Sequence, residues 1–341
     1  MNPYTLLIIA LSLILGTSTV ISSHHWMLAW LGLEINTLAI IPLMLKHPHP
    51  RAIEAATKYF LTQASASAVI LFSCTINAWT YGEWTIASTT NVVPMNLLTV
   101  AIMMKLGVAP FHFWMPDVMQ GLTLSTGLIL STWQKFPPMA LLLQLSQSTN
   151  LQLLLITGLL STIIGGWGGI NQTQIRKILA YSSIAHLGWM MVALKASPQL
   201  ALLNFLIYVT ITSTMFLALT SINTKNMSEV MLSWSKSPPL TALTLLTLLS
   251  LGGLPPLTGF LPKWMIAQEM IKQHLTLFTS TLLLSTLLSL FFYLRLSYVM
   301  SLTLAPNLSH ALTSWPHHIK TTTAVPITLS LLMLPTYPLI T

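Results

Sequence analysis

Charged residues are scarce in this sequence: only 6% of its 341 residues are Asp, Glu, Lys or Arg, whereas 54% are hydrophobic. Soluble domains carry roughly a quarter charged residues, so a water-soluble fold is excluded. The formal net charge is +8, yet the chain has no basic cluster interleaved with aromatic residues, which a nucleic-acid-binding surface would need. Nucleic acid is therefore excluded as a partner.

Cysteine is almost absent as well, because Cys74 is the single one in the chain. One thiol permits no intrachain disulfide, no cysteine-rich zinc site and no iron–sulfur cluster held by four thiolates. We expect Cys74 to be a small buried side chain. The sequence also lacks a phosphate loop. The glycines from Gly165 to Gly169 are not a dinucleotide fingerprint, because no strand precedes them. Their spacing is instead the one that lets membrane helices approach closely. We therefore expect no cofactor and no metal on this chain.

Long hydrophobic runs, by contrast, fill most of the sequence. A bilayer core about 30 Å thick needs about 20 apolar residues per helix, and about eleven runs of this kind occur. They cover residues 3–22, 25–45, 58–80, 94–121, 124–146, 150–171, 176–195, 198–222, 238–272, 275–299 and 322–340. The first run lacks a basic region and a cleavage site, so we expect it to be retained as a span. The sequence thus predicts an all-α polytopic membrane protein with about eleven transmembrane helices.

Two of these runs are too long for one simple span and contain prolines: Pro110 in the fourth, and Pro255 with Pro256 in the ninth. Proline removes a backbone donor and clashes with the preceding turn, so both helices should be broken. They are fourth in two successive blocks of five helices, which predicts an inverted repeat; chance spacing of two kinked helices is the alternative. The predicted division is residues 1–149 and 150–300 for the two repeats, and 301–341 for a loop and a C-terminal helix.

The basic residues at the helix ends predict the orientation. Placed on alternating sides, the loops and helix ends on one side hold nine basic residues and those on the other hold two. The nine are Lys46, Arg51, Lys58, Arg176, Lys177, Lys225, Lys236, Arg295 and Lys320, and the two are Lys195 and Lys272. This asymmetry is what the positive-inside rule describes. We expect the amino terminus on the positive side and the carboxyl terminus on the opposite side.

Four ionisable residues remain inside the predicted spans, namely Glu34, Lys105, Lys135 and Lys263. One charge at the bilayer centre costs about 2.5 to 3.5 kcal/mol, so four unpaired charges would cost on the order of 10 kcal/mol. Burial favours the neutral form of lysine and a nearby carboxylate favours its charged form, which suits proton relay. The alternatives are snorkelling lysines and a neutral, hydrogen-bonded acid at Glu34.

Two of the ten histidines, His112 and His186, also fall within predicted spans. Imidazole titrates near neutral pH, so either residue is a candidate for passing protons between the lysines. A hydrogen-bonded core histidine is the alternative for each. Their spacing does not suggest a pair of haem ligands, so a haem-bearing subunit is not expected.

Three stretches of sequence resemble one known family. They are K-L-G-V-A-P-F-H-F-W-M-P-D from Lys105 to Asp117, L-G-G-L-P-P-L-T-G-F-L-P-K from Leu251 to Lys263, and I-L-A-Y-S-S-I-A-H-L-G-W from Ile178 to Trp189. Together they resemble the antiporter-like subunits of respiratory complex I, along the whole chain. The stretch W-L-G-L-E-I-N from Trp30 to Asn36 resembles the animal mitochondrial form, which has three fewer amino-terminal helices than its bacterial relatives.

This resemblance implies a proton-translocating subunit of the membrane arm, coupled to electron transfer from NADH to ubiquinone. It implies other membrane-arm subunits, the lipid bilayer, protons and internal water as partners. The flavin, iron–sulfur clusters and ubiquinone would lie on other subunits. The location implied is the mitochondrial inner membrane, with the amino terminus in the matrix and the carboxyl terminus in the intermembrane space.

The resemblance also implies roles for the buried residues. Glu34 would be the acid of a Glu–Lys pair with Lys105, Lys135 the connecting lysine, and Lys263 the distal proton site. His112 and His186 would link these residues along a hydrated axis. Two other functions remain open from the residues themselves: a stand-alone secondary cation/proton antiporter, and a structural membrane-arm subunit without its own proton path.

Overall fold

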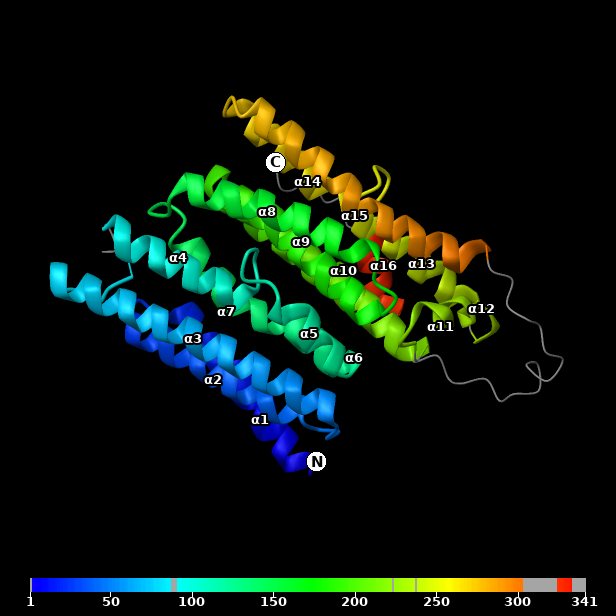
Figure 1. Cartoon of the computed structure of the whole chain (residues 1–341), viewed down its shortest axis with the longest axis horizontal. Helices are drawn as coiled ribbons and strands as arrows, with labels where there is room; N and C mark the ends of the chain where they lie inside the picture. The colour runs from blue at the N-terminus through cyan, green and yellow to red at the C-terminus, as the bar shows by residue number, and fades with distance from the viewer. Residues whose placement is uncertain (1, 87–90, 223, 237, 303–323, 333–341) are drawn as a thin grey trace.

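The chain folds into a bundle of helices that run roughly parallel to one another, as the computed structural model shows (Figure 1). The structure describes residues 2–86, 91–222, 224–236, 238–302 and 324–332. Within these residues, seven helices are long and apolar enough to cross a membrane. They are α1 (Pro3–Ser22), α2 (Trp26–Met44), α3 (Pro50–Tyr81), α8 (Leu151–Ile170), α9 (Ile175–Ala196), α10 (Pro198–Ile222) and α15 (Thr276–Leu302). The prediction of an all-helical polytopic membrane protein is confirmed.

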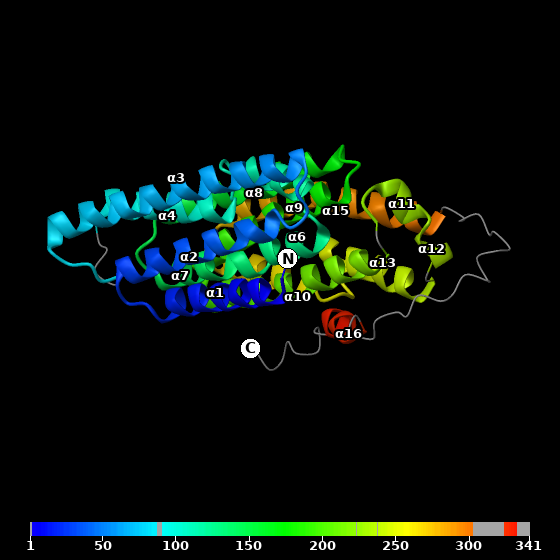
Figure 2. The same ribbon diagram turned by 90° about the horizontal axis from the view of Figure 1, so that it is seen from below.

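Shorter helices complete the bundle (Figure 2). They are α4 (Val92–Leu106), α5 (Trp114–Gly121), α6 (Leu124–Ser131), the 3₁₀ turn η1 (Trp133–Lys135), α7 (Phe136–Gln144), α11 (Met227–Met231), α12 (Ser233–Lys236), α13 (Pro238–Gly252), α14 (Phe260–Lys272) and α16 (Ala324–Leu332). Most bounds agree with the predicted runs to within a few residues. Of the predicted C-terminal span 322–340, only α16 is described; Lys320 and residues 333–341 lie outside the described residues.

Helix α3 starts eight residues earlier than the predicted start at residue 58. His49 caps it, because its Nδ1 atom accepts a hydrogen bond of 2.7 Å from the Ala52 amide, and Pro50 occupies the first turn, where a missing N–H is tolerated. The charged residues of the first turns lie on the helix surface, where Lys58 pairs with Glu54 at 2.7 Å. The predicted start was wrong because a turn with charged surface residues can belong to the same helix as the apolar run that follows it.

Both predicted helix breaks are present. Helix α4 ends at Leu106 and α5 begins at Trp114, while α13 ends at Gly252 and α14 begins at Phe260. A glycine with left-handed backbone follows each first half, Gly107 at φ +78° and Gly253 at φ +82°. Glycine adopts this conformation without a Cβ penalty, which is why it terminates helices so often.

The two breaks share one pattern over thirteen residues. When Lys105–Asp117 is written above Leu251–Lys263, the left-handed glycines coincide, as do the prolines Pro110 with Pro256 and Pro116 with Pro262. The lysines do not coincide: the first break has its lysine at the beginning of the pattern and the second has it at the end. The backbone of the break is therefore repeated, whereas the position of its charge is not.

Protein side chains satisfy several of the carbonyl groups that the breaks leave free. At the first break the Trp114 indole donates to the Met104 carbonyl at 3.2 Å, and the Gln63 amide donates to the Lys105 carbonyl at 3.4 Å. At the second break the Lys263 ammonium donates to the Gly252 carbonyl at 3.0 Å. Irregular backbone at membrane depth needs such internal partners.

A third break, which the sequence analysis did not predict, divides the run 124–146 into α6, η1 and α7. Here the Lys135 amide bonds to the Thr132 carbonyl at 3.1 Å, in place of the Ser131 carbonyl that a regular α-helix would use. Pro137 and Pro138 follow after Phe136 and contribute no N–H groups to the helix. The run 124–146 was expected to form a single span, and the irregular turn before this proline pair divides it.

Helices α8 and α9 cross at very close range through small residues. A Cβ atom added at Gly165 would lie 2.7 Å from the Ala185 amide nitrogen, and one at Gly188 would lie 2.7 Å from the Gly158 carbonyl oxygen. Only glycine fits such backbone contacts, as expected for small-residue interfaces between membrane helices. The close approach predicted for the glycine run is confirmed.

Gly188→Ala is therefore expected to lower the thermal midpoint of the assembled protein, by an overpacking cost of about 1–3 kcal/mol. Gly252→Ala is the matched control, since a Cβ there has its nearest neighbour at 3.7 Å, an ordinary contact. Thermal unfolding monitored by tryptophan fluorescence compares the two variants. Equal thermal midpoints would contradict the conclusion that only glycine fits where α8 and α9 touch.

Candidate functional site: a buried row of ionisable residues

All three lysines predicted inside the spans are buried, with exposed fractions of 6% for Lys105, 3% for Lys135 and 9% for Lys263. Lys105 is in the last turn of α4, Lys135 closes the turn η1, and Lys263 is in the first turn of α14. Their ammonium groups are enclosed by protein, so they do not snorkel to the surface of this chain. Each is therefore held where its charge needs a specific partner.

Glu34 on α2 faces Lys105, and their Oε1 and Nζ atoms are 3.9 Å apart. Within the described residues neither of these two atoms has a hydrogen-bond partner. The other carboxylate oxygen lies 3.4 Å from the Thr37 hydroxyl. Because the ion pair is long and not reinforced by a hydrogen bond, it is a loose pair that either partner can leave.

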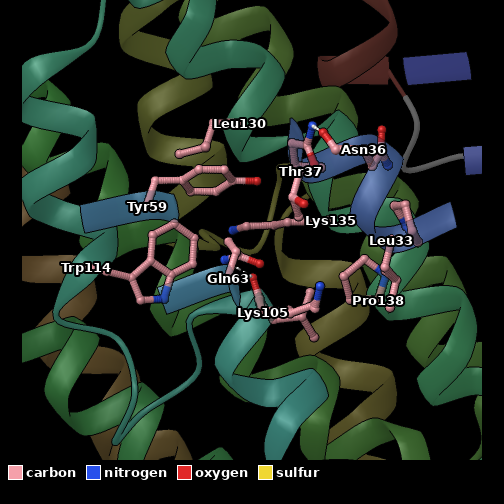
Figure 3. Close-up of a pocket in the computed structure, with 13 residues that line it drawn as sticks. Leu33, Asn36, Thr37, Tyr59, Gln63, Lys105, Trp114, Leu130, Lys135 and Pro138 are labelled. Carbon is pink, nitrogen blue, oxygen red and sulfur yellow. Dashed lines mark hydrogen bonds between the residues drawn. The ribbon is translucent and has the colours of Figure 1, made fainter. Parts of the chain in front are cut away.

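Lys105 and Lys135 line the same small cavity, which has a volume of about 20 Å³. Figure 3 shows Lys135 extended across the middle of the cavity, with Tyr59 on one side and Gln63 and Lys105 on the other. A cavity of this size has room for about one water molecule. The two lysines therefore border one water-sized space although they come from different helices.

Lys135 also reaches across to α10. Its Nζ atom donates a hydrogen bond of 3.0 Å to the Tyr208 hydroxyl, which in turn donates to the Ser131 carbonyl at 3.0 Å. The ring of His186 on α9 lies 5.6 Å from the Tyr208 ring, centroid to centroid. His186 also lines the cavity beside Lys263. It thus neighbours both the tyrosine that binds Lys135 and the cavity of Lys263.

Lys263 lies beside a second cavity of about 10 Å³, which His186, Tyr293 and several hydroxyl side chains also line. Its ammonium group is seated against Gly253: a Cβ atom at that glycine would lie 2.8 Å from Nζ. The carbonyl of Gly252, at the carboxyl end of α13, accepts its hydrogen bond. This end of a helix carries partial negative charge, which favours a cation.

His112 lies apart from these groups. It is buried in the first break, where its ring packs 4.3 Å from that of Phe113, and its Nδ1 atom has no partner within the described residues. It lines neither of the two cavities. The structure thus brings Glu34 to Lys105, Lys105 to Lys135, and His186 to Lys263, while His112 stays at the margin.

Sequence reasoning missed several neutral polar residues of the site. Tyr208 forms a hydrogen bond with Lys135, and Tyr59 and Gln63 line the cavity that Lys105 and Lys135 share. A signal was present, because Tyr208 is the single tyrosine in the run 198–222 and Gln63 interrupts the run 58–80. Asp117, the last residue of the first break motif, pairs with Lys58 at 2.8 Å. Nowhere in the described ranges do three His, Cys, Asp or Glu residues gather in a way that would hold a metal ion.

The chain matches a known family over most of its length. Residues 23–289 match the transmembrane family described as NADH:quinone oxidoreductase/Mrp antiporter, and residues 290–341 match the C-terminal region of NADH dehydrogenase subunit 2. Among solved structures, the fold is similar to a chain of respiratory complex I from Thermus thermophilus, with a TM-score of 0.85, 27% identity, and coverage of 98% of this chain and 80% of that one. A chain of the Mrp complex from Dietzia shares the fold at a TM-score of 0.80 and 16% identity, over 88% of this chain and 61% of that one.

Similar proteins of known identity carry the same name. NADH-ubiquinone oxidoreductase chain 2 of Xenopus laevis is 59% identical, with 99% of each chain covered. The protein of that name from Gallus gallus is 54% identical, with 100% of this chain and 99% of the other covered. The chain therefore belongs to the family of NADH-ubiquinone oxidoreductase chain 2, an antiporter-like membrane subunit of respiratory complex I.

Proposed function

We propose that this subunit moves protons across the mitochondrial inner membrane through its own buried ionisable residues, driven by electron transfer elsewhere in complex I. The observation that carries the proposal is a pair of small cavities: Lys105 and Lys135 both line the first, and His186 and Lys263 both line the second. The proposed relay consists of Glu34, Lys105, Lys135 and Lys263, with His112 and His186 as linking residues. His186 has the stronger support, since it lines the second cavity and His112 lines neither.

The energetics of the loose ion pair suit this role. Moving one charge against 100 mV requires about 2.3 kcal/mol. Two unit charges 4 Å apart interact by about 4 kcal/mol at an effective dielectric constant of 20, and Glu34 and Lys105 are 3.9 Å apart. Opening and closing this pair therefore involves an energy of the size that one proton transfer needs.

The finer architecture is also part of the proposal: eleven spans, with residues 1–149 and 150–300 as inverted repeats and 301–341 as a C-terminal unit. The shared pattern of the two breaks supports the repeat. The amino terminus is placed in the matrix and the carboxyl terminus in the intermembrane space. Two of the nine basic residues assigned to the matrix side bind carbonyl groups at or just beyond the carboxyl ends of helices. Arg176 donates to the Leu122 carbonyl, and Arg295 donates to the Ile170 carbonyl at 2.6 Å.

The surroundings of the subunit follow from the same proposal. Other membrane-arm subunits, the lipid bilayer and internal water are its partners, and nucleic acid is not among them. The flavin, the iron–sulfur clusters and ubiquinone belong to other subunits, so this chain contributes proton transfer and no redox step.

Replacing Lys263 by methionine is expected to lower the number of protons pumped per electron in the intact complex reconstituted into vesicles. NADH oxidation measured with an uncoupler should stay close to normal, because the redox groups are elsewhere. Lys272→Met is the matched control: it makes the same substitution on the same helix, but Lys272 is 70% exposed and pairs with Glu269. An unchanged proton-to-electron ratio in fully assembled Lys263→Met would favour a purely structural subunit, and proton exchange by the isolated chain in vesicles would favour a stand-alone antiporter.

A further inference from the structure

Tyr208 contacts both parts of the site, the first through its hydroxyl and the second through its ring. It lies near the middle of α10 and is 1% exposed. Its hydroxyl accepts from the Lys135 ammonium and donates to the Ser131 carbonyl, both at 3.0 Å. Its ring faces His186, which lines the Lys263 cavity. Tyr208 thus stands between the first cavity and the second.

The third helix break explains why this tyrosine fits here. Because the Lys135 amide bonds to the Thr132 carbonyl, the Ser131 carbonyl has lost its regular helical donor. A buried carbonyl without a donor is costly, and the Tyr208 hydroxyl supplies the missing hydrogen bond. The break therefore creates an acceptor that fixes the hydroxyl, and the fixed hydroxyl in turn fixes the ammonium group.

The chemistry of the contact suits a lysine that gains and loses a proton. The phenolic oxygen accepts a hydrogen bond from the ammonium group, and it can equally accept one from an N–H of the neutral amine. The phenolic proton stays on the Ser131 carbonyl in both cases. Tyr208 can therefore hold Lys135 in both protonation states without breaking its own anchor.

We propose that Tyr208 is a positioning residue for proton transfer, whose hydroxyl holds the Lys135 side chain at the junction between the Lys105 cavity and His186. This inference rests on the proposed function, because it assigns to Lys135 the step that Tyr208 directs. Tyr208 does so from α10, in the second of the two proposed repeats, whereas Lys135 is in the first. The contact thereby joins the two halves of the proton path.

The test is Tyr208→Phe in the intact complex, which removes the hydroxyl and keeps the ring beside Phe205 and His186. We expect a lower proton-to-electron ratio, with an unchanged KM for ubiquinone and near-normal uncoupled NADH oxidation. A purely structural defect reduces the amount of assembled complex and so lowers both rates together, leaving their ratio intact. Thr214→Val is the control, since it removes a buried hydroxyl of the same helix that donates to the Ile211 carbonyl of that helix at 2.7 Å.

Lys135→Met, measured in parallel, separates the two levels of the proposal. A lowered ratio in both Tyr208→Phe and Lys135→Met, with Thr214→Val normal, supports the role of Tyr208. A normal ratio in Tyr208→Phe with a lowered one in Lys135→Met overturns the role of Tyr208 and leaves the proposed function standing. A normal ratio in Lys135→Met overturns both, and a ratio lowered equally by Thr214→Val overturns the specific role of the hydroxyl.

Discussion

Lys105→Met is expected to slow proton-coupled turnover of the assembled complex by about a hundredfold, the lower end of what a positioned acid or base contributes. Methionine has a similar length and suits a buried site. What is lost is the ammonium group that faces Glu34 at 3.9 Å and lines the cavity shared with Lys135. Proton uptake into vesicles, normalised to the amount of assembled complex, measures the effect.

Two further variants identify the cause. Lys46→Met makes the same substitution at an exposed position near the end of α2 and should leave turnover unchanged. Glu34→Gln combined with Lys105→Met should be little worse than Lys105→Met alone, because residues acting as one unit are not additive. Full additivity of the two changes, or normal pumping by Lys105→Met, would show that the pair does not act in proton transfer.

Gly253→Ala is expected to reduce both stability and pumping. A residue with a Cβ atom in the left-handed conformation costs about 1–2 kcal/mol, and Gly253 has φ +82°. The new methyl group would also lie 2.8 Å from the Lys263 ammonium, which must then move away from the Gly252 carbonyl. The lysine would lose its hydrogen bond inside the protein, at a cost of about 1–3 kcal/mol or more.

Gly82→Ala separates these two effects, because Gly82 has the same left-handed backbone at φ +74° with nothing within 4 Å of an added Cβ atom. Both variants should show a lowered thermal midpoint, but only Gly253→Ala should show a lower proton-to-electron ratio. If Gly82→Ala lowers that ratio to the same extent, displacement of the Lys263 ammonium group is not the cause of the lower ratio in Gly253→Ala. Adding Lys263→Met to Gly253→Ala should produce little further loss of pumping.

The order and approximate bounds of the membrane helices could be predicted from the sequence. Each helix must satisfy its backbone hydrogen bonds internally and present apolar residues to lipid. Hydropathy therefore predicts α1, α8 and α10 closely. The positions of the breaks at Gly107 and Gly253 also follow from local chemistry, since proline and glycine act on the backbone within a few residues. The break before Pro137 obeys the same chemistry and could have been predicted from it.

The contacts of the site were not readable in the same way. That Lys105, Lys135 and Lys263 are buried follows from their places in apolar runs. Which neighbour each ammonium meets depends on how helices far apart in the sequence pack, and hydrophobic periodicity carries little information on rotation where helices are apolar on most faces. Tyr208 illustrates this limit: 73 positions separate it from Lys135, and the packing of α10 against α6 and α7, on either side of η1, brings them together.

The two broken helices have a consequence for how their charged residues are compared. Residue-by-residue alignment pairs Lys263 with Asp117, which is at the surface, and pairs Lys105 with Leu251. Yet Lys105 occupies the last turn of α4, and the Lys263 ammonium binds the last carbonyl of α13, so both cations belong to the carboxyl end of a half-helix. What the two breaks share is a binding position for a cation at the carboxyl end of a half-helix, and lysines from different positions of the pattern occupy it. Corresponding cations in other proteins with broken membrane helices are therefore better found by superposing helix ends than by aligning charged residues.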